Sequence, residues 1–222
     1  MRILRQTLIN RITHATIALS TFGLIFTGIL QMPVAKRYNL IHVPGLSWGG
    51  DYWFTLELHY WLALIFTVAC FWHLAYHGLR GEFDIVPRKG DFKGSVAVIA
   101  AMIAGTKEPA SDKYLPEQRL AWAGFVVVFA LIIVSGLIKT LKNIYGFDIS
   151  NDLYFACAMI HNAGLFLSIL LVIGHLAAFI VKANRFLLPG MFGGKIDAQY
   201  VLHRHSLWKD GVAQAKAALK QK

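Results

Sequence analysis

The sequence predicts an all-α integral membrane protein built as a four-transmembrane-helix bundle. Two observations lead to this fold class. The chain of 222 residues is 56% hydrophobic and only 15% charged, which is typical of proteins whose solvent is lipid. Its apolar residues also fall in four runs that are long enough to cross a hydrocarbon core about 30 Å thick. These runs cover residues 12–31, 53–76, 119–141 and 154–181.

The first run is expected to be a retained helix rather than a cleaved signal peptide. No small-residue cleavage site follows it, and it carries a histidine, His14.

The orientation of the helices follows from the distribution of basic residues. Of the 22 Lys and Arg residues, only Lys36, Arg37, Lys139 and Lys142 fall on the side of the bundle opposite to the termini. Because cytoplasmic segments are enriched in Lys and Arg, both termini are predicted to be cytoplasmic. Topology and anionic lipid then explain the formal charge of +10, so the charge does not indicate nucleic-acid binding.

The segments between and after the spans organise the rest of the chain, which we treat as a single domain over residues 1–222. The apolar run 95–105 is too short to cross the membrane and has Lys residues on both sides, so it predicts an interfacial helix in the second cytoplasmic loop. Residues 182–222 form the predicted cytoplasmic tail, and its end after Lys209 is expected to be a weak or frayed helix. The apolar external loop 32–52 is either a partner interface or a segment that dips into the headgroups.

Two spans each carry a pair of histidines 14 residues apart, His59 with His73 and His161 with His175. Fourteen residues are close to four helical turns, so each pair lies on one face of its helix. The rise of about 21 Å places one imidazole near either side of the membrane. Ionisable residues inside a membrane usually mark a functional site. Two stacked positions, each supplied by facing helices, suit two haems that are each held by two axial imidazoles.

Depth pairs His59 with His161 near the periplasm, whereas the cytoplasmic pair stays open. His175 has two candidate partners there, His14 and His73. The equal spacing in the second and fourth spans favours His73, but spacing alone does not decide between them.

The two cysteines exclude other redox centres in this chain. The sequence has no Cys-x-x-Cys-His motif for covalent c-type haem. Two cysteines cannot supply the four ligands of an iron–sulfur cluster. Any haem here is therefore expected to be b-type, and the chain is interpreted as a path for electrons across the membrane.

Several short motifs carry a family resemblance, in order along nearly the whole chain. They are Asn10-Arg-Ile-Thr-His14, Leu58-His59-Tyr-Trp, Lys113-Tyr114 with Gln118, Ile160-His161-Asn-Ala-Gly164, and the ending from Gly190-Met191 to Trp208. Together they resemble the cytochrome b (gamma) subunit of respiratory formate dehydrogenases. The cytochrome b subunits of thiosulfate reductases and nickel–iron hydrogenases share much of this plan.

The resemblance implies a ligand set for each haem. The periplasmic-side haem would take His59 and His161, and the cytoplasmic-side haem would take His14 and His175, with His73 as the alternative to His14.

The resemblance also implies a quinone pocket made by Lys113, Tyr114 and Gln118. This sequence departs from the family at Leu115, where the family usually has an asparagine that contacts quinone, and at Ala15, where it usually has a tryptophan. His42, His203 and His205 lie outside the spans, and we expect them to make surface or partner contacts rather than to bind haem.

The function that the resemblance implies is electron transfer in the inner (cytoplasmic) membrane of a bacterium or archaeon. A periplasmic iron–sulfur subunit, itself served by a catalytic subunit, would pass electrons through two haem b groups to menaquinone or ubiquinone near the cytoplasmic face. The chain would be the quinone-reactive subunit of a formate dehydrogenase, without a primary substrate site, and the complex would be a higher oligomer.

Three alternatives remain beside this interpretation. One is a subunit of a hydrogenase, a thiosulfate reductase or another respiratory oxidoreductase. Another is a haem anchor that exchanges electrons with a multihaem cytochrome without quinone turnover. The third, a histidine-lined metal or proton transporter, is disfavoured because only Glu57 places a carboxylate inside a predicted span.

Overall fold

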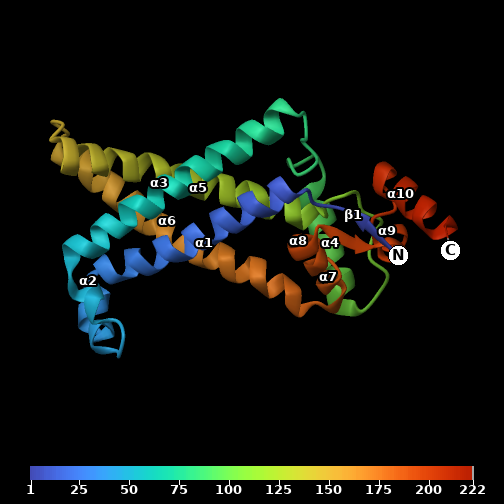
Figure 1. Cartoon of the computed structure of the whole chain (residues 1–222), viewed down its shortest axis with the longest axis horizontal. Helices are drawn as coiled ribbons and strands as arrows, with labels where there is room; N and C mark the ends of the chain where they lie inside the picture. The colour runs from blue at the N-terminus through green and yellow to red at the C-terminus, as the bar shows by residue number, and fades with distance from the viewer. Residues whose placement is uncertain (222) are drawn as a thin grey trace. The chain divides into compact units, whose positions relative to one another are not determined.

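The computed structural model of the chain describes residues 1–221 and is built almost entirely of helices (Figure 1). It confirms the all-α membrane fold, because four of its helices are long and apolar enough to cross a membrane. They are α1 (Leu8–Gln31), α3 (Tyr52–Leu79), α5 (Pro116–Tyr145) and α6 (Asn151–Ala177), the last continued by the 3-10 turn Ala178–Ile180.

The helices extend beyond the apolar runs that predicted them. The third helix, for example, begins at Pro116 rather than at residue 119. Hydropathy detects only the part of a helix that lies in hydrocarbon, whereas backbone hydrogen bonding continues into the polar interface. Proline suits the first helical position because its missing N–H would have no partner there.

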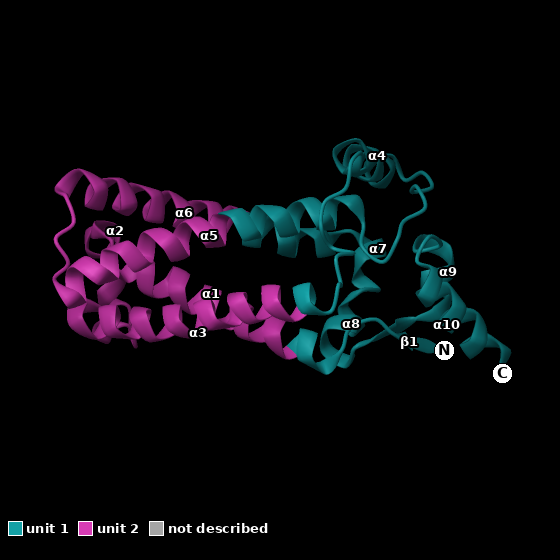
Figure 2. Cartoon of the chain, turned by 90° about the horizontal axis from the view of Figure 1, so that it is seen from above, with its two compact units in different colours: residues 1–11, 77–127, 171–222 teal, residues 12–76, 128–170 magenta. Residues whose placement is uncertain are grey.

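The chain divides into two compact units, coloured separately in Figure 2. Unit 2 comprises residues 12–76 and 128–170. It holds most of each long helix, together with α2 (Pro33–Arg37) and the 3-10 turns Leu40–His42 and Ser47–Gly50. These short elements belong to the loop that is predicted to face the periplasm.

Small residues bring the helices of unit 2 close together. A Cβ atom on Gly164 of α6 would lie 2.5 Å from Ile132 Cγ1 of α5, and one on Gly23 of α1 would lie 2.8 Å from Leu62 of α3. Close approach of this kind is how transmembrane helices associate without a hydrophobic driving force between them.

Unit 1 comprises residues 1–11, 77–127 and the described chain from residue 171 onward. Strand β1 (Arg2–Leu4) pairs antiparallel with β2 (Lys195–Asp197), with Ile3 opposite Ile196. The other elements are α4 (Asp91–Ala104), α7 (Lys182–Arg185), α8 (Leu188–Gly193), α9 (Ala198–Arg204) and α10 (Lys209–Lys220). Strand pairing therefore joins the N-terminal segment to the segment that follows α8.

The predicted tail after residue 182 is a folded element with its own core, and of the two expectations for its end after Lys209, a weak helix or a frayed segment, the structure has a helix, α10. Ile3 of β1 is buried in one cluster with residues of the tail, namely Ile196, Ala198, Val201, Trp208 and Ala215. Gly211 of α10 is required for this packing, because a Cβ there would lie 2.2 Å from the Trp208 ring. Five members of the cluster lie in the tail, but the sixth, Ile3, comes from the other end of the chain, so local periodicity does not reveal the cluster.

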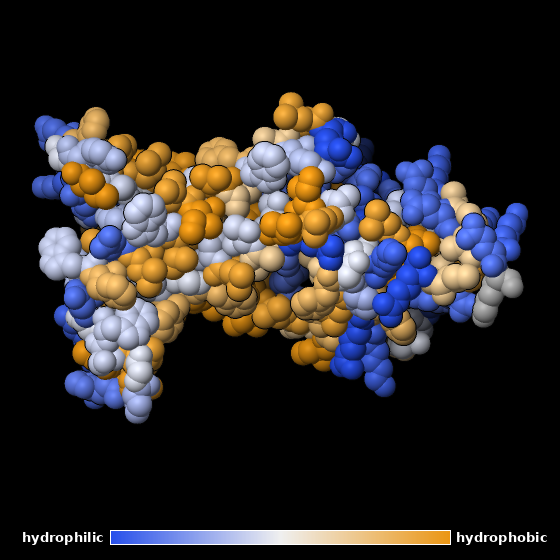
Figure 3. All heavy atoms as spheres, viewed as in Figure 1, coloured by the Kyte–Doolittle hydropathy of each residue, from blue (hydrophilic) through white to orange (hydrophobic). Residues whose placement is uncertain are grey.

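The predicted segment 95–105 is helical, and the helix α4 begins four residues earlier than expected, at Asp91. One face of α4 is buried in unit 1 and the opposite face is apolar and exposed. The exposed side chains are Phe92, Val96, Ile99 and Ile103. On the face of the molecule shown in Figure 3, hydrophobic side chains dominate over the long helices, and hydrophilic ones gather around α9 and α10. The interfacial position of α4 stays a prediction.

Candidate functional site

His59 of α3 and His161 of α6 face each other within unit 2. Their ring centroids are 6.3 Å apart, and the ring planes are inclined by 65°. Their positions along α3 and α6 place both side chains at a similar depth, toward the end of the bundle that is predicted to be periplasmic. The structure thus brings together the two histidines that the sequence paired by depth.

The hydrogen bond of His59 selects its tautomer. Nδ1 of His59 lies 2.8 Å from Thr27 Oγ1 of α1. The Thr27 hydroxyl in turn lies 2.8 Å from the carbonyl oxygen of Gly23, which can only accept a hydrogen bond. With its single hydroxyl proton on that carbonyl, Thr27 is an acceptor for His59 Nδ1–H, and this arrangement leaves Nε2 of His59 with a lone pair.

His161 reaches the same tautomer through a different helix. Its Nδ1 lies 3.2 Å from the carbonyl oxygen of Ile132 and 3.1 Å from Ser135 Oγ, both in α5. A carbonyl only accepts, so Nδ1 carries the proton, and the Ser135 hydroxyl donates to Leu131 O at 2.6 Å. Nε2 of His161 therefore also keeps a lone pair.

Glycine makes room for the ring of His161, whereas the glycine beside His59 leaves space for an ordinary contact. A Cβ on Gly136 of α5 would lie 3.0 Å from His161 Cε1, and a Cβ on Gly28 of α1 would lie 3.7 Å from His59 Cε1. The ring of His161 consequently lies directly against the backbone of α5. A larger residue at position 136 would have to push the ring toward His59.

The pair fits a haem iron by distance and by donor set. Imidazole nitrogens bind first-row metals at about 2 Å, so a metal ion between two of them separates the ring centres by about 6 Å. Within residues 1–221 no group of three or more His, Cys, Asp or Glu side chains could hold a metal ion. A porphyrin would supply four further ligands to a metal ion that two imidazoles hold. Hydrogen bonds from Nδ1–H to oxygen atoms are the usual way in which such ligands are oriented.

The other predicted ligands are distributed over both units. His14 of α1 and His73 of α3 belong to unit 2, whereas His175 of α6 belongs to unit 1. In unit 1 the His175 ring is packed between two aromatic rings, with Phe125 at 6.0 Å and Phe179 at 6.2 Å between centroids. The choice between His14 and His73 stays a prediction.

The predicted quinone residues lie in unit 1, where α5 begins. Gln118 is at the third position of the helix, and its Oε1 accepts a hydrogen bond of 3.1 Å from the backbone N–H of Leu115. This is one half of a capping box. Leu115, which replaces the family's usual asparagine, is fully buried. Gln118 thus has a structural role that the sequence analysis did not assign to it.

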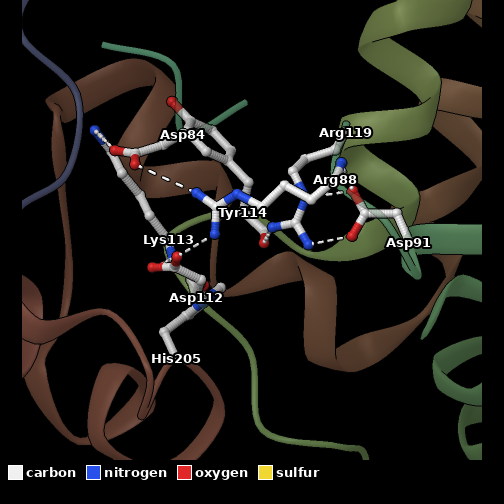
Figure 4. Close-up of polar contacts among 8 residues, drawn as sticks. All are labelled: Asp84, Arg88, Asp91, Asp112, Lys113, Tyr114, Arg119 and His205. Atoms are coloured by element: carbon white, nitrogen blue, oxygen red, sulfur yellow. Dashed lines mark hydrogen bonds and ion pairs between the residues drawn. The ribbon is translucent and has the colours of Figure 1, made fainter. Parts of the chain in front are cut away.

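Tyr114 is surrounded by basic residues. The Arg5 guanidinium and the Lys113 ammonium each lie 5.5 Å from the centre of its ring, and its hydroxyl accepts a hydrogen bond of 3.4 Å from Gln6 Nε2. Lys113 also approaches Asp84 Oδ2 at 3.9 Å. Figure 4 shows Asp84, Lys113 and Tyr114 of this group, with Arg119 at the start of α5.

A buried ion pair holds α4 to α5 beside this group. Arg119 donates from Nε to Asp91 Oδ2 at 2.8 Å and from Nη2 to Oδ1 at 2.5 Å (Figure 4). Both side chains are less than one-tenth exposed. The hydrogen bonds from Arg119 hold the pKa of the Asp91 carboxyl below its usual value.

The expectation that His205 makes surface contacts is wrong, whereas His203 is exposed as expected. His205 is fully buried. Its Nδ1–H donates to the carbonyl oxygen of Asp112 at 2.6 Å, and its Nε2 accepts from Arg5 Nη1 at 3.3 Å. Burial, reinforced by the charge of Arg5, lowers the pKa of His205 to about 4. Sequence position outside the spans suggested exposure because it carried no information about the tail's own core.

The sequence analysis also missed Glu117. It lies in the first turn of α5, ahead of the predicted span that began at residue 119. Both carboxylate oxygens are buried, and neither accepts a hydrogen bond from another of the described residues. The charges that act on the Glu117 carboxylate are those of Arg204, Glu108 and Arg119. A capping-box search that included the residues before the apolar run would have placed Glu117 in the helix.

The chain matches the family described as prokaryotic cytochrome b561 over residues 5–194. The matched segment contains all four transmembrane helices and all five histidines that were predicted as ligands or alternatives. No curated protein matches the chain.

Proposed function

Because the chain belongs to the prokaryotic cytochrome b561 family, whose members bind haem b and transfer electrons in the membrane, we propose that it holds two haems and reduces a quinone. It is a multi-pass bacterial membrane protein. We propose in addition which residues bind the haems, that a quinone accepts the electrons, and which kind of subunit donates them.

The facing pair His59 and His161 is the observation that supports it most directly. Each imidazole has an oxygen atom within hydrogen-bonding distance of its Nδ1, and the two rings lie 6.3 Å apart between centroids, which leaves Nε2 of each ring without a hydrogen bond to an oxygen of the described residues. Axial ligation of haem needs this tautomer on both sides of the iron. We assign the periplasmic-side haem to these two residues.

We assign the cytoplasmic-side haem to His14 and His175, with His73 as the alternative to His14. The aromatic neighbours of His175, Phe125 and Phe179, provide the apolar shell that excludes water from an axial ligand. The 14-residue interval along α6 separates the two sites by most of the membrane thickness.

The residues of the chain have three tasks in this proposal. Haem b, when bound, supplies one-electron transfer at a potential that its surroundings tune. The hydroxyls of Thr27 and Ser135 hold the imidazoles in orientation, and the hydrogen bonds increase the basicity of the ligating nitrogens. The surrounding apolar helix faces exclude water from the path.

Quinone reduction is proposed at the start of α5, on the predicted cytoplasmic side. Lys113 and Tyr114 offer donors to a quinone oxygen. Gln118 offers only its amide N–H groups, because its Oε1 already accepts the hydrogen bond of the helix cap. Glu117 adds a buried carboxylate without a partner in the described chain. Such a group is suited to carry the protons that a reduced quinone takes up.

The proposed donor is a periplasmic iron–sulfur subunit that serves a formate dehydrogenase, with a hydrogenase or thiosulfate reductase as the alternative complexes. The exposed aromatic side chains of the external loop and the adjacent helix start offer a surface for it. They include Tyr38, Trp48, Trp53 and Phe54.

The haem content of the purified protein tests the proposal. A pyridine haemochrome assay with a reduced-minus-oxidised spectrum is expected to give two b-type haems per chain. His59→Ala and His161→Ala should each remove the same single haem, whereas the exposed His42→Ala and His203→Ala should remove none. Comparing His14→Ala with His73→Ala identifies the partner of His175. Two haems that survive His161→Ala would refute the ligand assignment.

A haem anchor without quinone turnover is the second candidate function, and the burial of Leu115 favours it. The side chain that usually contacts quinone in the resembling family is here a fully buried leucine. A quinone analogue that shifts the spectrum of the cytoplasmic-side haem would exclude the anchor, and a spectrum that does not respond would support it.

A further inference from the structure

Lys139 places an ammonium group within the membrane-spanning part of α5, less than two turns before the helix ends at Tyr145. The side chain is partly buried. Within the described chain, its ammonium nitrogen makes no hydrogen bond and no ion pair. A charge in this position is costly unless an anion or water compensates it.

Lys142, one turn further along the same helix, shows what a satisfied lysine looks like here. Its Nζ donates to the carbonyl oxygen of Ile149 at 3.0 Å and to Asn151 Oδ1 at 3.2 Å, and it lies 4.8 Å from the centre of the Tyr154 ring. These partners come from the loop and the helix that follow α5. The neighbouring Lys139 has no equivalent partner.

Lys139 lies on the face of α5 that contacts His161. Ser135 and Gly136 are four and three residues before it, so all three side-chain positions share one face of the helix. Ser135 is hydrogen-bonded to the His161 ring, and Gly136 lies against it. The charge of Lys139 acts on both His59 and His161. The ammonium group therefore belongs to the surroundings of the facing imidazoles.

Haem b brings its own anions to such a site. The macrocycle is apolar except at one edge, where two propionate groups end in carboxylates. In a membrane this edge turns toward the nearer aqueous surface, and Lys139 lies between the imidazole pair and the external end of α5. We propose that Lys139 binds a propionate carboxylate of the haem held by His59 and His161. This inference rests on the proposed function, because it requires a haem at that pair.

The proposed contact has two measurable consequences. An ammonium–carboxylate contact in a poorly hydrated site retains the haem. A positive charge beside the macrocycle also favours the reduced iron, since reduction adds an electron to the site. Replacing Lys139 should therefore accelerate haem loss and lower the midpoint potential of the haem at the imidazole pair.

The test compares Lys139→Met with the matched control Lys142→Met in the purified full-length protein. We expect Lys139→Met to release haem to apomyoglobin about tenfold faster than the wild type, and to lower one of the midpoint potentials in a redox titration. Lys142→Met should change neither quantity, and Lys139→Arg should retain most of both.

Reconstitution with haem b dimethyl ester, whose propionates are neutral, identifies the anion. In the wild-type protein the ester should be released to apomyoglobin faster than haem b, as haem b is from Lys139→Met, and Lys139→Met should add no further acceleration with the ester. An effect of Lys139→Met that persists in full with the ester would assign the lysine to a lipid phosphate and overturn the proposal. Equal haem release from Lys139→Met and Lys142→Met would overturn it as well.

The failure of the proposed function would look different. In that case His161→Ala would leave the haem content of the protein unchanged, and no haem at the imidazole pair would exist for Lys139 to bind. A single haem lost in His161→Ala, together with no response to Lys139→Met, rejects only the propionate contact.

Discussion

His161 in unit 2 and His205 in unit 1 make the same kind of hydrogen bond, from Nδ1 to a backbone carbonyl oxygen, but have different roles. The acceptor is the carbonyl oxygen of Ile132 for His161, at 3.2 Å, and the carbonyl oxygen of Asp112 for His205, at 2.6 Å. Nε2 of His205 then accepts from Arg5. The ring of His161 instead lies beside a second imidazole, that of His59, at 6.3 Å between centroids.

The difference shows that the partner of the second nitrogen decides what a buried histidine does. A histidine whose two nitrogens are both bonded within the protein stabilises the fold, as His205 does by joining Arg5 to the loop that contains Asp112. A histidine whose second nitrogen keeps its lone pair is available as a ligand. Burial and one hydrogen bond do not distinguish the two cases.

Exchanging the two histidines for alanine gives the largest expected contrast. His161→Ala should remove one haem and leave the unfolding of unit 1 unchanged. His205→Ala should keep both haems but destabilise unit 1 by about 1–3 kcal/mol for each buried group left unpaired. Haem content and thermal unfolding in detergent measure the two effects. Loss of haem in both variants would mean that the histidines do not have separate roles.

Breaking the buried ion pair of unit 1 is expected to cost nearly as much. Asp91→Asn leaves the Arg119 guanidinium buried without its counter-charge, which typically costs about 3–5 kcal/mol. Asp84→Asn is the matched control, because Asp84 is half exposed and pairs with Arg88 at 3.6 Å; its cost should stay under about 1 kcal/mol. Similar unfolding temperatures for the two variants would contradict the structural role of Asp91.

The pH dependence of stability should report His205. Its pKa is lowered from 6.5 to about 4 in the folded chain, so the unfolded chain binds the extra proton first as the pH falls. The contribution of His205 is present above pH 6.5 and is lost between pH 6.5 and 4, at about 1.4 kcal/mol per unit. His205→Asn keeps a donor for Asp112 O and should flatten this part of the curve. His203→Asn, at an exposed position, should leave the slope as it is.

Removing the hydroxyl that orients a ligand should have the smallest effect. Thr27→Val deletes the acceptor for His59 Nδ1–H at nearly constant volume, and outer hydrogen bonds of this kind contribute about 10- to 100-fold in affinity. Haem release should accelerate within that range while the haem count of the fresh protein stays the same. Thr140→Val is the control, because among the described residues the Thr140 hydroxyl bonds only to the Gly136 carbonyl of its own helix. Equal rates of haem release from the two variants would show that the Thr27 hydroxyl does not support haem binding.

The separate contributions of sequence and structure can be followed in particular residues. The depth of His59 and His161 was predictable, because a helix rises by a constant amount per residue and a membrane restricts which residues it can contain. The hydroxyls of Thr27 and Ser135 were not, since each lies on a different helix from the ring that it orients. Glu117 was missed for another reason, namely that the predicted boundary at residue 119 excluded it.

The sequence by itself determined the four transmembrane helices and the positions of the histidines along them, because both depend on local composition and on the constant geometry of the helix. The family match supports the interpretation of these features as a membrane cytochrome b. Only the tertiary structure decided which nitrogen of each imidazole is available, that His205 is buried, and that β1 completes the core of the C-terminal segment. These properties depend on contacts between residues that are far apart in the chain. The physical reason is that the role of a polar group depends on its hydrogen-bond partner, and tertiary packing decides which partner that is.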